Sequence, residues 1–249
     1  TLPTGLQAKP GQLASVANVS MLRAVTYQHW TAAIRKVTHL DAATGVIGFT
    51  KPPATYTGDL PSGSRVYLEN APEYLFSGSG TFFADDDMIY YAPLAAELQQ
   101  FSRNNVEVLA AVPGLLELVH NNHTSDIHLE NLVFSHTDVD YKSCFAGNCA
   151  LQSATWLDSA AVHFEFSTNL VMRNVSIEHT GGFGLWLGAG VHNASFEHGR
   201  VLDVGAGGVR IGEAVSMDSD ERKAENVLVS DSVIRDGGHI YRAGCGVLL

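Results

Sequence analysis

Four polar residues recur at matching places in the second half of the chain. They are His136, His179, Asp203 and Asp236, each five residues beyond one of the anchors Asn131, Asn174, His198 and Asp231. If the repeats form neighbouring strands of a parallel sheet, about 4.8 Å separates them. Retaining glycosidases hold two carboxyl groups ~5–5.5 Å apart, and inverting ones hold them ~6.5–9.5 Å apart. The pattern therefore predicts a close carboxyl pair that could carry such chemistry, with Asp203 and Asp236 as the candidate catalytic residues.

Four residues, His179 among them, are candidates for holding a sugar. Trp186 offers a flat apolar ring with a polar N–H at its edge, and Arg210 offers fixed donors for hydroxyls or a carboxylate. Glu213 could reach the same face if the strand bends at Gly212, which makes it a third candidate carboxylate. His179 could orient or charge-balance the carboxyl pair. We expect these residues to line the substrate-binding site; the alternative for Trp186 is that it packs under a loop.

The direction of the polar side chains depends on where the chain bends. In an unbroken strand, residues two positions beyond a core residue point inward. Glycines that follow the polar residues, such as Gly205 and Gly237, favour a bend that turns Asp203 and Asp236 to solvent. A later bend would instead expose Ser135, Glu178, Leu202 and Arg235, and Glu178 would become the candidate carboxylate. Stacked polar residues at corners can also serve structure alone by bonding backbone groups.

Apolar columns on either side of these residues define a structural repeat. The first run of each unit gives the columns Ile127/Leu170/Ala194/Val227, Leu129/Met172/Phe196/Val229 and Phe134/Ile177/Val201/Ile234; the second gives Val162/Leu185/Val209/Val247 and Phe164/Leu187/Ile211/Leu249. Short alternating runs separated by glycine are typical of strands. Such units bury their apolar faces by stacking on one another. The sequence predicts an all-β fold, a right-handed parallel β-helix with one unit per coil.

The first half of the chain differs in composition and pattern from the repeats. Residues 1–54 are expected to form a first, partial coil region of the β-helix. Residues 55–112 are rich in Tyr, Phe, Pro, Ser and Asp and are expected to form a small inserted antiparallel β module, with ADDDM as its hairpin turn. Residues 113–249 would then hold the coils. Because the chain starts at Thr1 and stops within a strand pattern, we expect it to be a C-terminally truncated fragment of a longer protein.

Composition excludes several classes of partner. The chain has 249 residues, a net charge of −11 and only 15 basic residues, so nucleic acid and acidic membrane surfaces are not expected to bind it. It has no apolar run of about 18 residues, so no membrane insertion is expected. Cys144 and Cys149 are close enough for a local disulfide, and Cys245 sits in a strand pattern. With four N-glycosylation triplets, at Asn18, Asn122, Asn174 and Asn193, this favours a secreted, extracellular protein.

We expect no metal and no cofactor. His163, His192 and His239 lack the HxH or HExxH spacing of a catalytic zinc site. The three adjacent aspartates of ADDDM are expected to form a solvated loop rather than a calcium site. Two cysteines alone would not complete a zinc site. The glycine-rich stretch Gly205–Gly208 is not followed by a helical pattern, which argues against a phosphate cradle.

Several phrases resemble one group of carbohydrate-active proteins. YQHWTAAIRKV, RVYLENAPEYL, IHLENLVFSHT, HTGGFGLWLGAG, DVGAGGVRIGE and DGGHIYRAGCGV occur in this order. They are similar to phrases of right-handed β-helix glycoside hydrolases of family 141 and, more distantly, family 120 β-xylosidases. The resemblance implies a fucosidase or a xylosidase/xylanase-like enzyme acting on cell-wall polysaccharide or oligosaccharide. Two alternatives stay open: a polysaccharide lyase on the same fold, which would need a more basic groove, and a non-catalytic carbohydrate-binding or adhesive solenoid.

Overall fold

The computed structural model divides the chain into two units. The described residues are 5–27, 30–49, 62–75, 78–85, 87–99, 108–141, 144–145, 152–214 and 219–249. Unit 1 comprises residues 1–109 and 143–150, and unit 2 comprises residues 110–142 and 151–249. Among the described residues nearly all regular structure is β, with three short 3₁₀ segments: η1 (Pro72–Tyr74), η3 (Gln152–Ala154) and η4 (Asp220–Arg222). Within these ranges, no helix has the length and apolar character that a membrane crossing requires.

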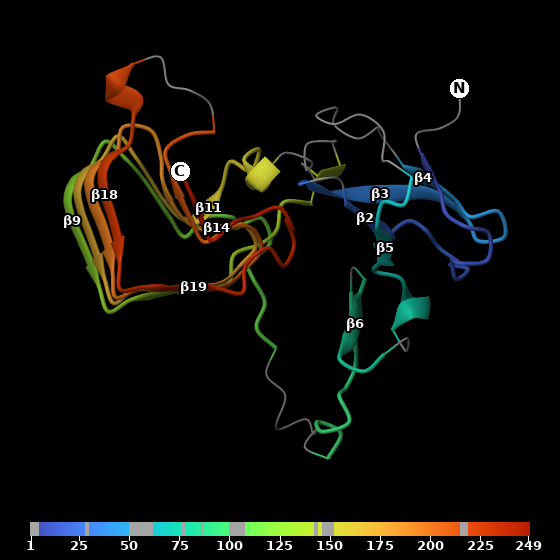
Figure 1. Cartoon of the computed structure of the whole chain (residues 1–249). Helices are drawn as coiled ribbons and strands as arrows, with labels where there is room; N and C mark the ends of the chain where they lie inside the picture. The colour runs from blue at the N-terminus through green and yellow to red at the C-terminus, as the bar shows by residue number, and fades with distance from the viewer. Residues whose placement is uncertain are drawn as a thin grey trace. The chain divides into compact units, whose positions relative to one another are not determined.

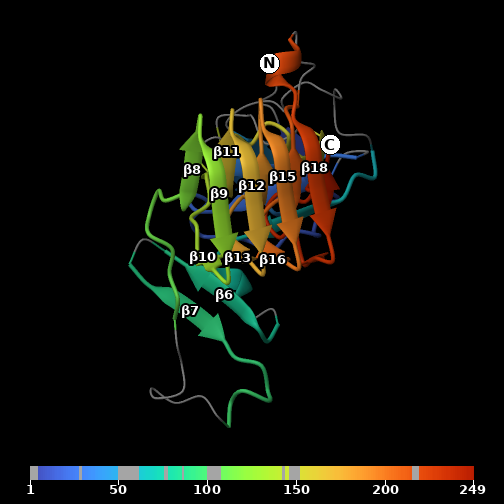
Figure 2. The same cartoon turned by 90° about the vertical axis from the view of Figure 1, so that its left-hand side faces the viewer.

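Unit 2 consists of three parallel sheets that the chain visits in turn (Figure 1). The first contains β8 (Val119–Asn122), β11 (Ala160–Glu165), β14 (Phe183–Leu187), β17 (Val209–Ile211) and β20 (Val247–Leu248). The second contains β9 (Ser125–Glu130), β12 (Thr168–Arg173), β15 (His192–Glu197) and β18 (Glu225–Ser230). The third contains β10 (Val133–Ser135), β13 (Ser176–Thr180), β16 (Arg200–Val204) and β19 (Val233–Arg235). Each circuit adds one strand to each sheet, so equivalent strands lie side by side, as Figure 2 shows for β9, β12, β15 and β18.

Strand register in unit 2 follows the apolar columns of the sequence. Val162 is paired with Leu185, Leu185 with Val209, and Val209 with Val247. The columns that begin at Ile127 and at Phe134 are paired in the same way. Apart from Val247, which is exposed, these side chains form one continuous interior with Phe164, Phe196 and their neighbours. The predicted register of the repeats is therefore confirmed.

A polar residue in the left-handed conformation marks each corner between the second and third sheets. The four anchors Asn131, Asn174, His198 and Asp231 have φ of 57°, 51°, 51° and 48°. A further set, Asp126, Asn169, Asn193 and Asn226, has φ of 57°, 56°, 55° and 53° near the start of the second-sheet strands. Asn and Asp tolerate this region better than other non-glycine residues. Their side chains also bond from coil to coil, as Asn174 Nδ2 does to Asn131 Oδ1 at 2.7 Å.

The strands of unit 1 pair antiparallel, which differs from the partial coil expected over residues 1–54. Its five-stranded sheet has the order β1 (Gly5–Gln7), β4 (Val46–Phe49), β3 (Ala32–Asp41), β2 (Arg23–Tyr27) and β5 (Val66–Glu69). β2 pairs with β5, so the sheet continues across the boundary placed at residue 54. The hydrophobic alternation of these strands fits either kind of pairing, and close sequence neighbours pair antiparallel through short turns.

A separate antiparallel hairpin follows the sheet in unit 1. It joins β6 (Thr81–Ala84) to β7 (Ile89–Ala92). Asp85, Asp87 and Met88 of the ADDDM phrase lie between the two strands, where the phrase was predicted to form a turn. The Asp85 carboxylate accepts hydrogen bonds from the backbone N–H groups of Asp87 and Met88. Cys144 is disulfide-bonded and Cys245 is a half-buried free thiol, whereas Cys149 lies outside the described residues.

Candidate functional site

The predicted carboxylates lie on the outer wall of unit 2, where the third sheet ends. His136, His179, Asp203 and Asp236 all have positive φ, between 52° and 69°. This turn of the backbone directs Asp203 and Asp236 outward, and their side chains are 50% and 58% exposed. The chain thus bends at the polar residue itself. The alternative, a later bend that would have made Glu178 the candidate carboxylate, is not found. The expected solvent-facing position of both aspartates is found.

Two histidines hold Asp203. Nδ1 of His179, on the preceding coil, lies 2.6 Å from Asp203 Oδ2, and Nε2 of His239 lies 3.2 Å from Oδ1. Asp236 occupies the equivalent position one coil further on, because Leu202 is paired with Arg235 immediately before the two aspartates. The Asp236 carboxylate lies 3.6 Å from the guanidinium of Arg235. This cluster contains His179 as predicted, and it adds His239, which the sequence did not indicate.

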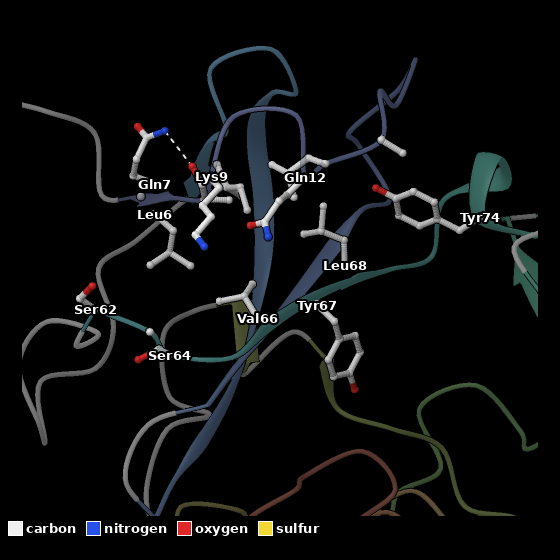
Figure 3. Close-up of a pocket in the computed structure, with 16 residues that line it drawn as sticks. Leu6, Gln7, Lys9, Gln12, Ser62, Ser64, Val66, Tyr67, Leu68 and Tyr74 are labelled. Atoms are coloured by element: carbon white, nitrogen blue, oxygen red, sulfur yellow. Dashed lines mark hydrogen bonds between the residues drawn. The ribbon is translucent and has the colours of Figure 1, made fainter.

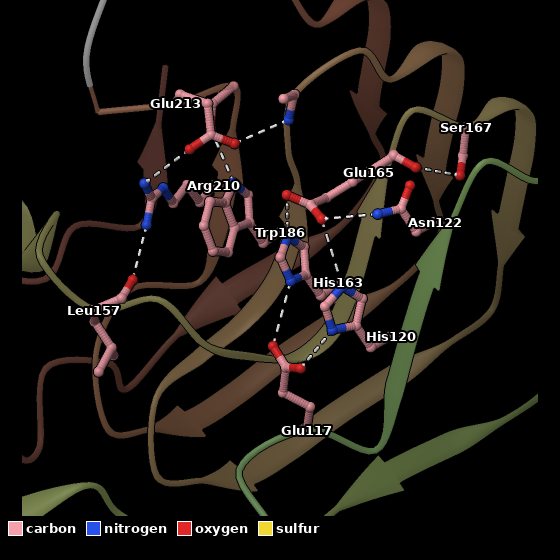
Figure 4. Close-up of polar contacts among 12 residues, drawn as sticks. Glu117, His120, Asn122, Leu157, His163, Glu165, Ser167, Trp186, Arg210 and Glu213 are labelled. Atoms are coloured by element: carbon pink, nitrogen blue, oxygen red, sulfur yellow. Dashed lines mark hydrogen bonds and ion pairs between the residues drawn. The ribbon is translucent and has the colours of Figure 1, made fainter. Parts of the chain in front are cut away.

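Trp186 and Arg210 are not on the open wall, which corrects their prediction as solvent-facing sugar contacts. Their exposed fractions are 4% and 2%. They lie on the first sheet, where His120, His163, Trp186 and Arg210 follow one another on β8, β11, β14 and β17 (Figure 4). The Arg210 guanidinium lies 3.8 Å from the Trp186 ring centroid and donates to the Leu157 carbonyl at 2.9 Å. Burial lowers the pKa of Arg210, against the raising effect of the charges on Glu213 and Asp158.

In the structure, Glu213 contacts the buried column of side chains that contains Trp186 and Arg210. One carboxylate oxygen lies 3.6 Å from Arg210 Nη2, and the other accepts from the Ala189 backbone N–H at 2.9 Å. Trp186 Nε1 donates to the Gly212 carbonyl at 2.9 Å. The predicted site residues therefore divide between two sheets: His179, Asp203 and Asp236 at the end of the third, and Trp186, Arg210 and Glu213 on the first.

The first sheet also carries a group of titratable residues that sequence reasoning missed. Glu117, His120, His163 and Glu165 meet at its β8 edge (Figure 4). His120 and His163 are 43 residues apart but directly paired. Burial raises the pKa of Glu117, but hydrogen bonds and charges from His163 and His120 outweigh it, and the net pKa is lowered. The matching phrases VHNN and VHFE, at Val119 and Val162, were the signal that could have indicated this pairing.

Unit 1 contains a separate open cavity, shown in Figure 3, of about 1030 Å³. Its lining includes Leu6, Leu13, Val66 and Leu68 from the sheet and its neighbouring loop. Among the described lining residues Lys9 is the one charged side chain, and no carboxylate is present. The described lining therefore contains no carboxyl pair of the kind that glycosidases use.

Comparison with known proteins gives a likeness of fold. No model of a known protein family matches the sequence, and no curated protein matches it either. One solved structure, described as a glycoside hydrolase, is similar, with a TM-score of 0.72 and 18% sequence identity over 94% of this chain. The match covers 47% of that protein, so this chain spans about half its length. At this identity the likeness concerns the fold.

Proposed function

We propose that this chain is a secreted glycoside hydrolase domain on a right-handed parallel β-helix, related to family 141 and more distantly to family 120. Its proposed substrate is a cell-wall polysaccharide or oligosaccharide, with fucose or xylose as the sugar released. The likeness to a glycoside hydrolase supports the fold part of this proposal. The three-sheet circuit of unit 2 supports it as well. Activity must be argued from the site, because one fold can host many functions.

One observation carries the activity: Asp203 and Asp236 occupy equivalent, half-exposed, left-handed positions on adjacent coils. Neighbouring parallel strands are about 4.8 Å apart, which is close to the ~5–5.5 Å carboxyl separation of retaining glycosidases. The Asp203 carboxylate is fixed by His179 and His239. We therefore assign Asp203 as the nucleophile and Asp236 as the acid/base.

The reaction then proceeds in two steps. Asp203 attacks the anomeric carbon as the glycosidic C–O bond breaks, and Asp236 transfers its proton to the departing oxygen. In the second step a water molecule gives a proton to Asp236. The oxygen of this water bonds to the anomeric carbon, and the bond between that carbon and Asp203 breaks. His179 and His239 keep the Asp203 oxygens in place for both displacements.

The experiment uses aryl fucosides and aryl xylosides with good and poor leaving groups. Asp203→Asn should lower kcat by at least about 100-fold on all of them. Asp236→Asn should lose activity mainly on substrates with poor leaving groups, because good ones depart without protonation. Asp231→Asn is the matched control, since Asp231 is an exposed aspartate at the other corner, with φ of 48°. All three substitutions introduce asparagine, which tolerates the left-handed conformation.

Other outcomes would replace this proposal. Parental activity in both Asp203→Asn and Asp236→Asn would remove the aspartate pair from catalysis. Cleavage that yields unsaturated uronates would indicate a polysaccharide lyase. Glycan binding with no cleavage of any glycoside would indicate an adhesive solenoid.

A further inference from the structure

Two stacked imidazole rings lie between two carboxylates at the β8 edge of the first sheet (Figure 4). The ring centroids of His120 and His163 are 4.6 Å apart, with 30° between their planes. Glu117 faces Nδ1 of both rings, and Glu165 faces Nε2 of both rings. The distances between carboxylate oxygens and ring nitrogens are shorter on the Nδ1 side than on the Nε2 side. This difference indicates that Glu117 and Glu165 have different roles.

On the Nδ1 side the contacts are hydrogen bonds. The Glu117 oxygens lie 2.8 Å from His120 Nδ1 and 3.3 Å from His163 Nδ1. A carboxylate oxygen accepts hydrogen bonds, and the ring nitrogens that face it donate them. Both Nδ1 atoms therefore carry a proton. In the neutral rings, both Nε2 atoms then present a lone pair.

On the Nε2 side the distances exceed those of hydrogen bonds. The Glu165 oxygens lie 3.6 Å from His120 Nε2 and 4.0 Å from His163 Nε2. The His163 side chain is only 4% exposed, and its Nε2 is buried without a hydrogen-bond partner among the described residues. A buried lone pair facing a carboxylate is costly unless something joins them.

We propose that His120 Nε2, His163 Nε2 and the Glu165 carboxylate bind a divalent transition-metal ion, with Zn²⁺ as the best fit. Two ligand atoms held ~2.0–2.1 Å from a tetrahedral zinc ion lie about 3.4 Å apart. Glu165 Oε2 lies 3.6 Å from His120 Nε2 and Oε1 lies 4.0 Å from His163 Nε2, so binding would draw these side chains slightly closer together. The set is imidazole plus carboxylate, which suits zinc better than calcium or magnesium.

Glu117 completes the arrangement as an outer partner. Histidines that bind zinc usually donate their other ring N–H to a carboxylate, which fixes the tautomer and the ring orientation. Asn122 Nδ2 lies 3.4 Å from Glu165 Oε2 and supports that carboxylate in turn. The His120 side chain is 45% exposed, so the site is open on one side for water or another ligand. The ion would also tie β8 to β11 on the next coil.

The test uses the full chain, stripped of metal with a chelator and titrated with Co²⁺ followed by competing Zn²⁺. We expect one ion per chain, with visible absorption bands that report the ligand geometry. His120→Ala and Glu165→Gln, at partly exposed positions, should each weaken binding at least 100-fold. Glu117→Gln should weaken it by about 10–100-fold. Circular dichroism verifies that each variant is folded.

The matched control is His179→Ala, which removes an imidazole from the other histidine–carboxylate cluster and should bind as tightly as the parent. Loss of binding in this variant, with retention in Glu165→Gln, would overturn the proposal. Stronger loss in Glu117→Gln than in Glu165→Gln would move the ion to the Nδ1 side and refute the ligand assignment. Absence of stoichiometric binding by the folded parent would refute the site. None of these outcomes depends on glycosidase activity.

Discussion

The indole ring of Trp186 lies flat against the imidazole ring of His163, with centroids 4.0 Å apart and ring planes 4° apart. Arg210 covers the opposite face of the same indole. Trp186 is therefore held between neighbours on two adjacent coils. Both faces of this sheet are buried here, because the apolar interior lies beneath it and Leu157 and Glu213 bind the column from outside.

Replacing Trp186 should destabilise the protein strongly. Trp186→Ala should lower the free energy of unfolding by about 3–5 kcal/mol, because a large buried side chain leaves a cavity. Trp186→Phe keeps an aromatic ring but loses the hydrogen bond to the Gly212 carbonyl and should cost about 1 kcal/mol from that bond alone. Guanidinium unfolding followed by circular dichroism measures both. Leu228→Ala, on an exposed strand position, should stay within about 1 kcal/mol. Equal effects of Trp186→Ala and Leu228→Ala would contradict the buried stack.

Two glycines of unit 2 should respond very differently to a methyl group. A Cβ on Gly205 would lie 2.2 Å from the Gly181 carbonyl oxygen, whereas a Cβ on Gly212 has no atom within 4 Å. Gly205→Ala should therefore cost about 3 kcal/mol or more, since the obstacle is backbone. Gly212→Ala should cost only about 1–2 kcal/mol, for its φ of +75°. Thermal unfolding of the two variants compares them. A smaller effect at Gly205 than at Gly212 would show that the coils are less closely stacked at this corner.

The asparagine ladder should stabilise the coils through both backbone and side chain. Asn193 Oδ1 accepts from Asn226 Nδ2 at 3.2 Å, and the residue has φ of 55°. Asn193→Gly removes the side-chain bonds but suits the backbone, and should cost about 1 kcal/mol. Asn193→Ala adds about 1–2 kcal/mol for the left-handed conformation. The difference between the two variants in urea unfolding measures the backbone part, and an alanine variant as stable as the glycine variant would contradict it.

Stability should depend on pH through Glu117. Its folded pKa is lowered below the ordinary value of 4.5. A carboxyl group of this kind contributes stability above its unfolded pKa and loses it as the pH falls through its folded pKa. The advantage of the parent over Glu117→Gln should thus be full near neutral pH and should decrease below 4.5. Denaturant unfolding at several pH values, with a chelator present, measures this advantage. An advantage that grows on acidification would contradict the assignment.

The sequence was sufficient to predict the repeat and its strand register, but not to predict which loops and side chains cover the outer faces of the sheets. The columns beginning at Ile127 and Val162 could be read because core residues of stacked coils must be apolar at fixed places. The burial of Trp186 and Arg210 could not be predicted in this way. Strand alternation indicates which face of the sheet a residue lies on, but not whether a loop covers that face. Asp203 was placed correctly because its following glycine indicated a bend. The pairing of His120 with His163 depends on coil length, which varies along this chain.

The left-handed corner residue has a consequence for how such a protein can diversify. At the end of the third sheet one coil carries His179 and the next carries Asp203, yet the backbone makes the same turn at both. The turn demands a backbone conformation and not a particular functional group. Evolution can therefore exchange acid, base and amide along the wall, one position at a time, while the apolar interior keeps its composition. New surface chemistry can in this way arise on an old scaffold.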